Sequence, residues 1–433
     1  MDRLTGVASW GLALAIACML QPTPAGAIPV FARIYDKPCG TCHTVFPQLN
    51  PAGENFRAHG FHGLPAAVKP LHAGSLEVPG TLPLALYFTV GEDVSQERSG
   101  ATRTHFDVDA FSLLAGGELG SRLAFLVDYE LVETEPDTGD VTIHSLPEQA
   151  YLQAHAEPAG WLGNLRLGWF ELPLGVSPRV HRLSAAPYLT YGLTACRLLG
   201  SAPPGVACDD VAVLDEAQIG VELGGLAPAT GFGWVLGATN GSNNRLDDSA
   251  SRDFYARVSQ PIGLHRIGLF VFYSPDLLGA GSRDRTLRVG PDVSWYNRRL
   301  RVLAQFLANH ESNPTGHSEG LWYYGGFVEG EYRFTTWLLG LVRTEYAWTP
   351  RFDDRSEGGE TEVRRRLWSV TGGGQWLLLQ NFKLVAEVTF QEDRETVSNA
   401  NDHSWFGTIR AVSAFWALDP LLGFSAWRRE ATR

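Results

Sequence analysis

Most of the chain alternates apolar and polar side chains with a period of two, which is typical of β-strands whose two faces meet different surroundings. In Ser121–Leu131, every second residue from Leu123 to Leu131 is apolar, and charged residues such as Asp128 lie between them. Thr81–Val90, Glu148–His155 and Asn381–Phe390 repeat the pattern. Similar segments are centred near residues 108, 167, 220, 236, 256, 269, 290, 304, 327, 342, 370 and 410. Together they predict about sixteen strands, most of them about 9–12 residues long.

This strand pattern favours a membrane barrel over a soluble β-protein. About sixteen strands are too many for one soluble barrel or sandwich, and the repeat of about 40–50 residues expected of a propeller is missing. Aromatic residues gather near the predicted strand ends, as they do at the two interfaces of membrane barrels. We therefore predict an all-β fold, a transmembrane antiparallel β-barrel over residues 81–416. Trp405–Trp416 is the expected closing strand, and residues 417–433 form a C-terminal tail.

The residues before the barrel predict export and a small separate domain. Arg3, the apolar stretch 7–20 and the sequence Ala25-Gly26-Ala27 resemble a secretory signal with its cleavage site, over residues 1–27. Residues 28–80 are irregular and rich in Pro, Gly and His. The net charge of −12 argues against a nucleic-acid partner. We expect the mature chain in the outer membrane of a bacterium, in contact with its lipid.

One motif in residues 28–80 carries specific chemistry. Cys39-Gly40-Thr41-Cys42-His43 is the C-x-x-C-H signature of covalent haem c attachment. Two thiols on one turn bond the porphyrin, and the adjoining imidazole is the proximal iron ligand. A thioredoxin-type redox pair would need a βαβ frame, which is missing. A zinc site that also uses His59 and His62 stays open. The sequence thus predicts a small N-terminal haem c domain that plugs the barrel, with one haem.

The second axial ligand is less well defined by the sequence. The only methionines are Met1 and Met19, both inside the predicted signal. Lysines such as Lys37 and Lys69 are protonated near neutral pH. We expect His59 as the distal ligand, then His62 and then His72. A five-coordinate iron, or a barrel histidine such as His105 or His155, is the alternative.

The N-terminal domain also resembles a known family. Phe31-Ala32-Arg33-Ile34-Tyr35, the haem motif, Phe46-Pro47, Leu49-Asn50, Gly53, Phe56-Arg57 and Gly60-Phe61 are similar to the fused cytochrome–porins of bacterial outer membranes. That resemblance implies one haem c domain followed by a barrel of about sixteen strands. It also implies oxidation of extracellular Fe(II) and electron transfer to periplasmic carriers. Residues Leu167–Gly175 resemble anion-selective porins.

These features lead to one functional hypothesis and two alternatives. We expect a monohaem electron conduit across the outer membrane, a possible iron:cytochrome oxidoreductase. Its partners would be Fe(II) or another extracellular donor or acceptor, and a periplasmic c-type cytochrome or other electron carrier. One alternative is a diffusion porin with a redox-sensing haem. The other is a soluble periplasmic cytochrome with a β-rich binding domain.

Two further features concern the predicted loops. Cys196 and Cys208 lie in the longest stretch without alternation, about residues 175–212, and their spacing in an oxidising compartment predicts a disulfide. It either staples a loop, the simpler interpretation, or holds a constriction or lid. Acidic pairs would attract cations or simply stay solvated; they are Asp209-Asp210, Asp215-Glu216, Asp247-Asp248 and Asp353-Asp354.

Overall fold

A computed structural model describes most of the chain between residues 30 and 415. The described ranges are 30–65, 67–73, 76–97, 100, 102–134, 141–142, 147–155, 163–199, 208, 211–227, 229–241, 251–275, 284–316, 320–350, 352–354, 361–379, 381–395 and 401–415. The predicted signal (1–27), the tail (417–433) and the acidic pairs Asp209-Asp210 and Asp247-Asp248 lie outside these residues.

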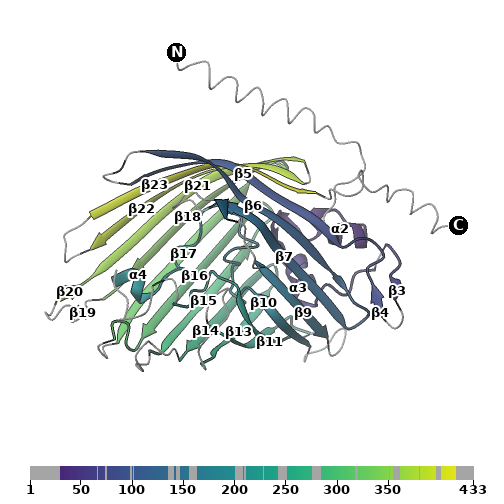
Figure 1. Ribbon diagram of the computed structural model, residues 1–433, viewed down its shortest axis with the longest axis horizontal. Coiled ribbons are helices and arrows are strands. Elements are labelled where there is room, and N and C mark those ends of the chain that lie inside the picture. The colour runs from purple at the N-terminus through teal and green to yellow at the C-terminus, as the bar shows by residue number, and fades with distance from the viewer. Residues whose placement is uncertain are drawn as a thin grey trace, which may run out of the picture.

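Within the described residues, sixteen antiparallel strands form a closed barrel, which confirms the predicted all-β antiparallel barrel, whereas the N-terminal haem c plug stays a prediction (Figure 1). The strands are β5 (Leu84–Glu97), β6 (Arg103–Glu118), β7 (Leu123–Thr134), β9 (Gln149–His155), β10 (Asn164–Phe170), β11 (Gln218–Leu226), β12 (Gly233–Thr239), β13 (Asp253–Ile262), β14 (His265–Ser274), β15 (Thr286–Tyr296), β16 (Leu300–Glu311), β17 (Leu321–Arg333), β18 (Leu338–Trp348), β21 (Arg365–Leu379), β22 (Phe382–Glu395) and β23 (Asn401–Phe415). Strand β23 pairs with β5 and closes the sheet, as expected for this segment. The short strand β8 (Val141–Thr142) extends the pairing of β7.

The alternation of side chains explains why this sheet is stable in a membrane. On β9, Leu152 is 54% exposed on the outer surface, whereas its neighbour Gln153 is 1% exposed and faces the lumen. On β22, Val388 is 55% exposed and the adjoining Glu387 only 4%. The polar residues are therefore inside and the apolar residues outside, the reverse of a soluble protein. A closed sheet also leaves no unpaired backbone edge in lipid.

The connections at the two ends of the barrel differ in length. At one end five turns have two to four residues, namely 119–122, 263–264, 297–299, 334–337 and 380–381. The other end carries the long connections 171–217, 240–252, 275–285 and 349–364, the last with the hairpin β19 (Phe352–Asp354) and β20 (Thr361–Val363). Short turns face the periplasm in outer-membrane barrels, so we assign the short-turn end to the periplasm.

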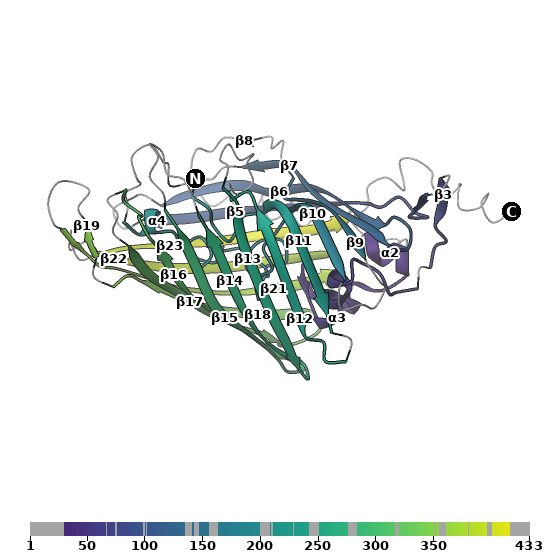
Figure 2. The same cartoon turned by 90° about the horizontal axis from the view of Figure 1, so that it is seen from below.

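The N-terminal segment, residues 30–80, lies at the short-turn end of the barrel (Figure 2). Its elements are α2 (Val30–Tyr35), the 3₁₀ turn η1 (Cys39–Thr41), β1 (His43–Val45), β2 (Gln48–Leu49), α3 (Pro51–Ala58), β3 (Leu71–Ala73) and β4 (Leu76–Val78). Helix α4 (Ala195–Leu199) lies near the opposite end, towards β19 (Figures 1 and 2). None of the helices in the described residues has the length and apolar character needed to cross a bilayer.

Candidate functional site

The two cysteines of the C-x-x-C-H motif lie on a single tight turn. Cys39 begins η1, and Cys42 follows it as the C-cap. Both thiols are free and partly exposed. Residues three apart on a 3₁₀ turn point to the same side, so the two thiols can bond one flat group. Burial raises the pKa of both thiols, which keeps them protonated near neutral pH.

The backbone holds His43 in the orientation that an iron ligand needs. Its Nδ1 donates a hydrogen bond to the carbonyl oxygen of Pro47 at 3.0 Å, which leaves Nε2 as the ligating atom. The ring of Phe46 lies 5.4 Å from the imidazole, between centroids. Burial lowers the pKa of His43, so the ring is neutral near pH 7, the state in which imidazole binds metals.

Asn50 and Gly53 fix α3 against this turn. The Asn50 side chain caps α3 by accepting from the Gly53 backbone N–H at 2.9 Å. Its Nδ2 donates to the carbonyl of Thr41 at 3.1 Å, and its backbone N–H donates to that of Cys42 at 2.9 Å. A Cβ at Gly53 would lie 2.1 Å from the Cys42 carbonyl oxygen, so only glycine allows the helix so close. Asn50 and Gly53 are thus positioning residues for the motif.

This set of side chains fits covalent haem c. The chain offers two free thiols on one turn and an adjacent imidazole whose Nδ1 is already occupied. Within the parts of the chain that the structure describes, no group of three or more His, Cys, Asp or Glu side chains is arranged to hold a metal ion. Haem iron does not require such a group, because the porphyrin supplies four ligands and the protein one or two.

The three candidates for the distal ligand occupy different places. His59 caps the C-terminal end of α3, and its Nδ1 donates to the Asn55 carbonyl at 2.7 Å. No described residue engages its Nε2. Both ring nitrogens of His62 contact carbonyl oxygens, those of Gly60 at 2.8 Å and of Gly120 at 3.3 Å. His72 is exposed on the β3–β4 hairpin, 3.1 Å from Glu77.

The structure does not bring the motif and these histidines into one cluster. His43 lies opposite Leu49 in the β1–β2 pair, next to the N-terminal end of α3, while His59 lies at the other end of the helix. His62 instead packs against His155 of β9, with ring centroids 4.6 Å apart. His59 therefore keeps its role as a prediction, and it has the free nitrogen that ligation would need.

One histidine near the motif was not expected from the sequence. His181, in the connection between β10 and β11, approaches the same Pro47 carbonyl as His43, with its Nδ1 at 3.2 Å. Burial lowers its pKa well below the ordinary value, so the ring is neutral. Its place in a long stretch without alternation gave no sign that this stretch turns back towards the N-terminal segment.

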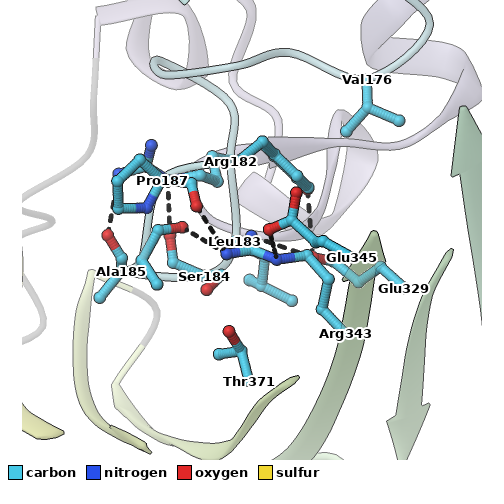
Figure 3. A network of polar contacts seen from close by, with 12 residues as sticks. Val176, Arg182, Leu183, Ser184, Ala185, Pro187, Glu329, Arg343, Glu345 and Thr371 are labelled. Carbon is cyan, nitrogen blue, oxygen red and sulfur yellow. Dashed lines mark hydrogen bonds and ion pairs between the residues drawn. The ribbon is translucent and has the colours of Figure 1, made fainter. Parts of the chain in front are cut away.

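The described residues of the connection 171–217, which are 171–199, 208 and 211–217, fold into the lumen rather than over the surface. Arg343 of β18 anchors it from the wall: its Nη2 donates to the carbonyls of Ala186 at 3.0 Å and Pro187 at 2.8 Å (Figure 3). The Glu387 carboxylate accepts from the backbone N–H of Ala185 and the hydroxyl of Ser184, both at 2.8 Å. We call residues 171–217 the inner loop.

The disulfide Cys196–Cys208 is present, as predicted, within the inner loop. It links Cys196 of α4 to Cys208. Arg365 of β21 donates hydrogen bonds from Nη1 to the carbonyl of Arg197 at 2.9 Å and to that of Leu198 at 2.8 Å. Of the three interpretations of this region, a stapled loop, a constriction and a lid, the contacts with the barrel wall favour the constriction. Glu216, of the acidic pair Asp215-Glu216, forms an ion pair with Arg179 at 3.0 Å.

The N-terminal segment contacts the barrel wall on several sides. The Tyr35 hydroxyl donates to Glu118 of β6 at 2.8 Å, and Thr44 bonds Tyr296 of β15 at 2.6 Å. Further contacts join Arg333 of β17 to the Thr44 carbonyl at 2.6 Å, Gln48 to Glu331 of β17, Glu54 to Arg266 of β14, and Asn164 of β10 to the Ala58 carbonyl. The segment therefore spans the periplasmic mouth, from β6 to β17.

Comparisons with known proteins support the barrel. No protein-family model matches the chain, and no curated protein matches it. Among solved structures, the outer membrane channel DcaP of Acinetobacter baumannii is similar over 80% of this chain and 100% of its own, at 10% identity and a TM-score of 0.54. The anion-selective porin from Comamonas acidovorans is similar over 77% and 99%, at 12% identity and a TM-score of 0.53.

These similarities show the fold, which is that of outer-membrane porins. Together with the closed sheet and the apolar outer surface, they confirm the predicted place in the bacterial outer membrane. By themselves they match the diffusion-porin alternative better than the electron conduit, because neither description names a haem group. The predictions of haem c and of iron as a substrate depend on the N-terminal motif alone.

Proposed function

We propose that this outer-membrane barrel carries one haem c on its N-terminal segment and transfers electrons between the cell exterior and the periplasm. Cys39 and Cys42 would hold the porphyrin, and His43 would be its proximal ligand. When bound, the haem supplies one-electron chemistry. With Fe(II) as donor, each Fe²⁺ loses one electron to become Fe³⁺, and a periplasmic c-type cytochrome or other carrier gains that electron.

The orientation of His43 is the observation that carries this proposal. An imidazole whose Nδ1–H is bound to a carbonyl keeps its Nε2 unprotonated, which is how metal-ligating histidines are usually set. The neighbouring thiols are free, and Asn50 ties their turn to α3. A thioredoxin-type redox pair needs no imidazole held in this way directly after the second cysteine.

The position of the motif suits transfer to a periplasmic partner. The N-terminal segment lies at the short-turn end, and Gly40 within the motif is exposed. The same segment contacts strands from β6 to β17. A segment that plugs the mouth would let electrons cross through a bound cofactor, whereas solutes need an open passage.

A diffusion porin with a redox-sensing haem is the second candidate. The observation that favours it is the porin fold, shared over more than three quarters of the chain. In that case the inner loop would act as the pore constriction. This function predicts large and stable ion conductance in planar bilayers, whereas the electron conduit predicts a nearly closed channel.

Reduction by Fe(II) tests the iron role directly. The purified, oxidised full-length protein is mixed with Fe²⁺ at neutral pH, and the haem spectrum is followed with time. We expect reduction of the haem, then reoxidation when an oxidised c-type cytochrome is added. A haem that is reduced by dithionite but not by Fe²⁺ would eliminate iron as the donor. Planar-bilayer conductance of the same preparation separates the two candidates.

A further inference from the structure

A cavity of about 600 Å³ lies beside α3, inside the barrel. Its walls come from α3, from the inner loop and from strands β9 to β16. It reaches the short turn at Gly263 and Leu264, so it lies towards the periplasmic side. Its size is in the range of small-molecule sites. The haem motif, residues 39–43, does not line it, whereas His59, the predicted distal ligand, does.

Positive charge is concentrated in this cavity although the chain as a whole is acidic. Five arginines line it, and four of them have carboxylate partners. The pairs are Arg166 with Glu222 at 3.0 Å, Arg257 with Asp292 at 2.7 Å, and Arg266 and Arg301 with Glu54, the latter at 3.7 Å. The fifth, Arg57, projects from α3, and no described residue forms a hydrogen bond or ion pair with its guanidinium.

Arg57 is half-buried and lines the cavity together with buried donors that lack a partner. His181 of the inner loop lines the same cavity. Within the described residues that line the cavity, Arg166 Nε and Trp234 Nε1 are buried without a hydrogen-bond acceptor, and Gln48 Oε1 and Gln153 Oε1 are buried without a donor. Arg166 is 8% exposed. A buried donor without an acceptor is costly, so such a group in a native fold calls for a bound partner.

The charge of Arg57 favours an anion over water, whereas the other unpartnered groups of the wall include both donors and acceptors. Water donates as often as it accepts, and it does not neutralise a guanidinium. An oxyanion only accepts, and its oxygens match the planar fork of an arginine. We infer that this cavity binds a carboxylate or phosphate, with Arg57 as the charged contact and Arg166 and Trp234 as supporting donors.

The anionic group has two sources, which the test separates. One is a small solute that enters from the periplasm. The other is a propionate of a haem carried by the N-terminal segment. The inference goes beyond electron transfer, because the residues that form the site lie outside the haem motif.

Calorimetric titration of the full-length chain in detergent tests the site, with succinate and inorganic phosphate as probes. Two preparations are compared, the haem-loaded protein and the C39S/C42S chain. Binding of either probe to both preparations identifies a solute site. Binding to the C39S/C42S chain alone identifies a propionate as the occupant. Binding to neither would overturn the inference. If the wild-type protein takes up no haem, this result counts against the proposed function, and the titration of the C39S/C42S chain still tests the anion site.

Substitutions assign the site to Arg57. R57Q keeps much of the side chain and removes its charge, so we expect binding to weaken by at least about tenfold. R57K keeps the charge and should bind better than R57Q. R298Q, at an exposed turn of the same end, should bind like the wild type. Unchanged affinity in R57Q would refute the assignment. If R57Q does not fold, as judged by its mobility on unheated gels, R57K becomes the test variant. Its affinity for the probe must then differ from that of R298Q.

Discussion

Replacing Arg343 with methionine tests how firmly the inner loop is held. Arg343 is fully buried, with its Nε 2.9 Å from Glu345 and its Nη1 3.6 Å from Glu329. The guanidinium also stacks on Tyr188, 4.3 Å from the ring centroid. Methionine fills the space of the stem but leaves two buried carboxylates without their cation. Breaking a buried ion pair in this way costs about 3–5 kcal/mol.

The substitution should therefore destabilise the barrel and free the inner loop. In R343M we expect a lower temperature for the loss of the compact barrel on heated gels, and a larger conductance in planar bilayers. R343M/E345Q removes one of the orphaned charges, so its stability should partly recover. R298M, at an exposed position, is the matched control. If R343M melts like the wild type and conducts no more current, the inner loop is not held by this network.

Three further predictions concern other parts of the chain. Burial and Glu118 raise the pKa of Tyr35, so its contribution to docking of the N-terminal segment is full below pH 10, the ordinary tyrosine pKa, and is lost progressively as the pH rises from there towards the raised pKa. Y35F should cost about 1–3 kcal/mol and abolish this dependence, measured by protease resistance of the segment between pH 8 and 11; an identical pH profile would contradict this. C196S/C208S should lower the unfolding free energy by about 3 kcal/mol in denaturant titrations, and an unchanged midpoint would show that the disulfide adds nothing. H59A should convert the haem spectrum from low spin to high spin while H62A leaves it unchanged, and the reverse result would assign the distal ligand to His62.

The alternation of side chains made the barrel predictable. Each strand faces lipid on one side and a polar lumen on the other, so apolar and polar residues alternate along every strand. The segment Glu148–His155 was predicted as a strand and forms β9 as Gln149–His155. The C-x-x-C-H motif could also be recognised in the sequence, because covalent haem attachment requires both cysteines and the histidine within five consecutive residues.

The inner loop could not be predicted in the same way. Its position depends on contacts between residues far apart in the chain, such as Ser184 with Glu387, 203 positions later. Carboxylates of the wall accept from its backbone N–H groups, and any residue except proline supplies those. His181 and Arg57 owe their surroundings to this folding. Local sequence patterns carry no signal for such contacts.

The covalent haem content of the full-length chain tests the central claim most directly. The protein is produced in a host that matures c-type cytochromes, isolated from the outer-membrane fraction and assayed as the pyridine haemochrome after acid–acetone extraction. We expect one haem per chain that resists extraction, and none in C39A/C42A, whose barrel still folds. A colourless wild-type barrel in which both Cys39 and Cys42 react with an alkylating agent would contradict the proposal.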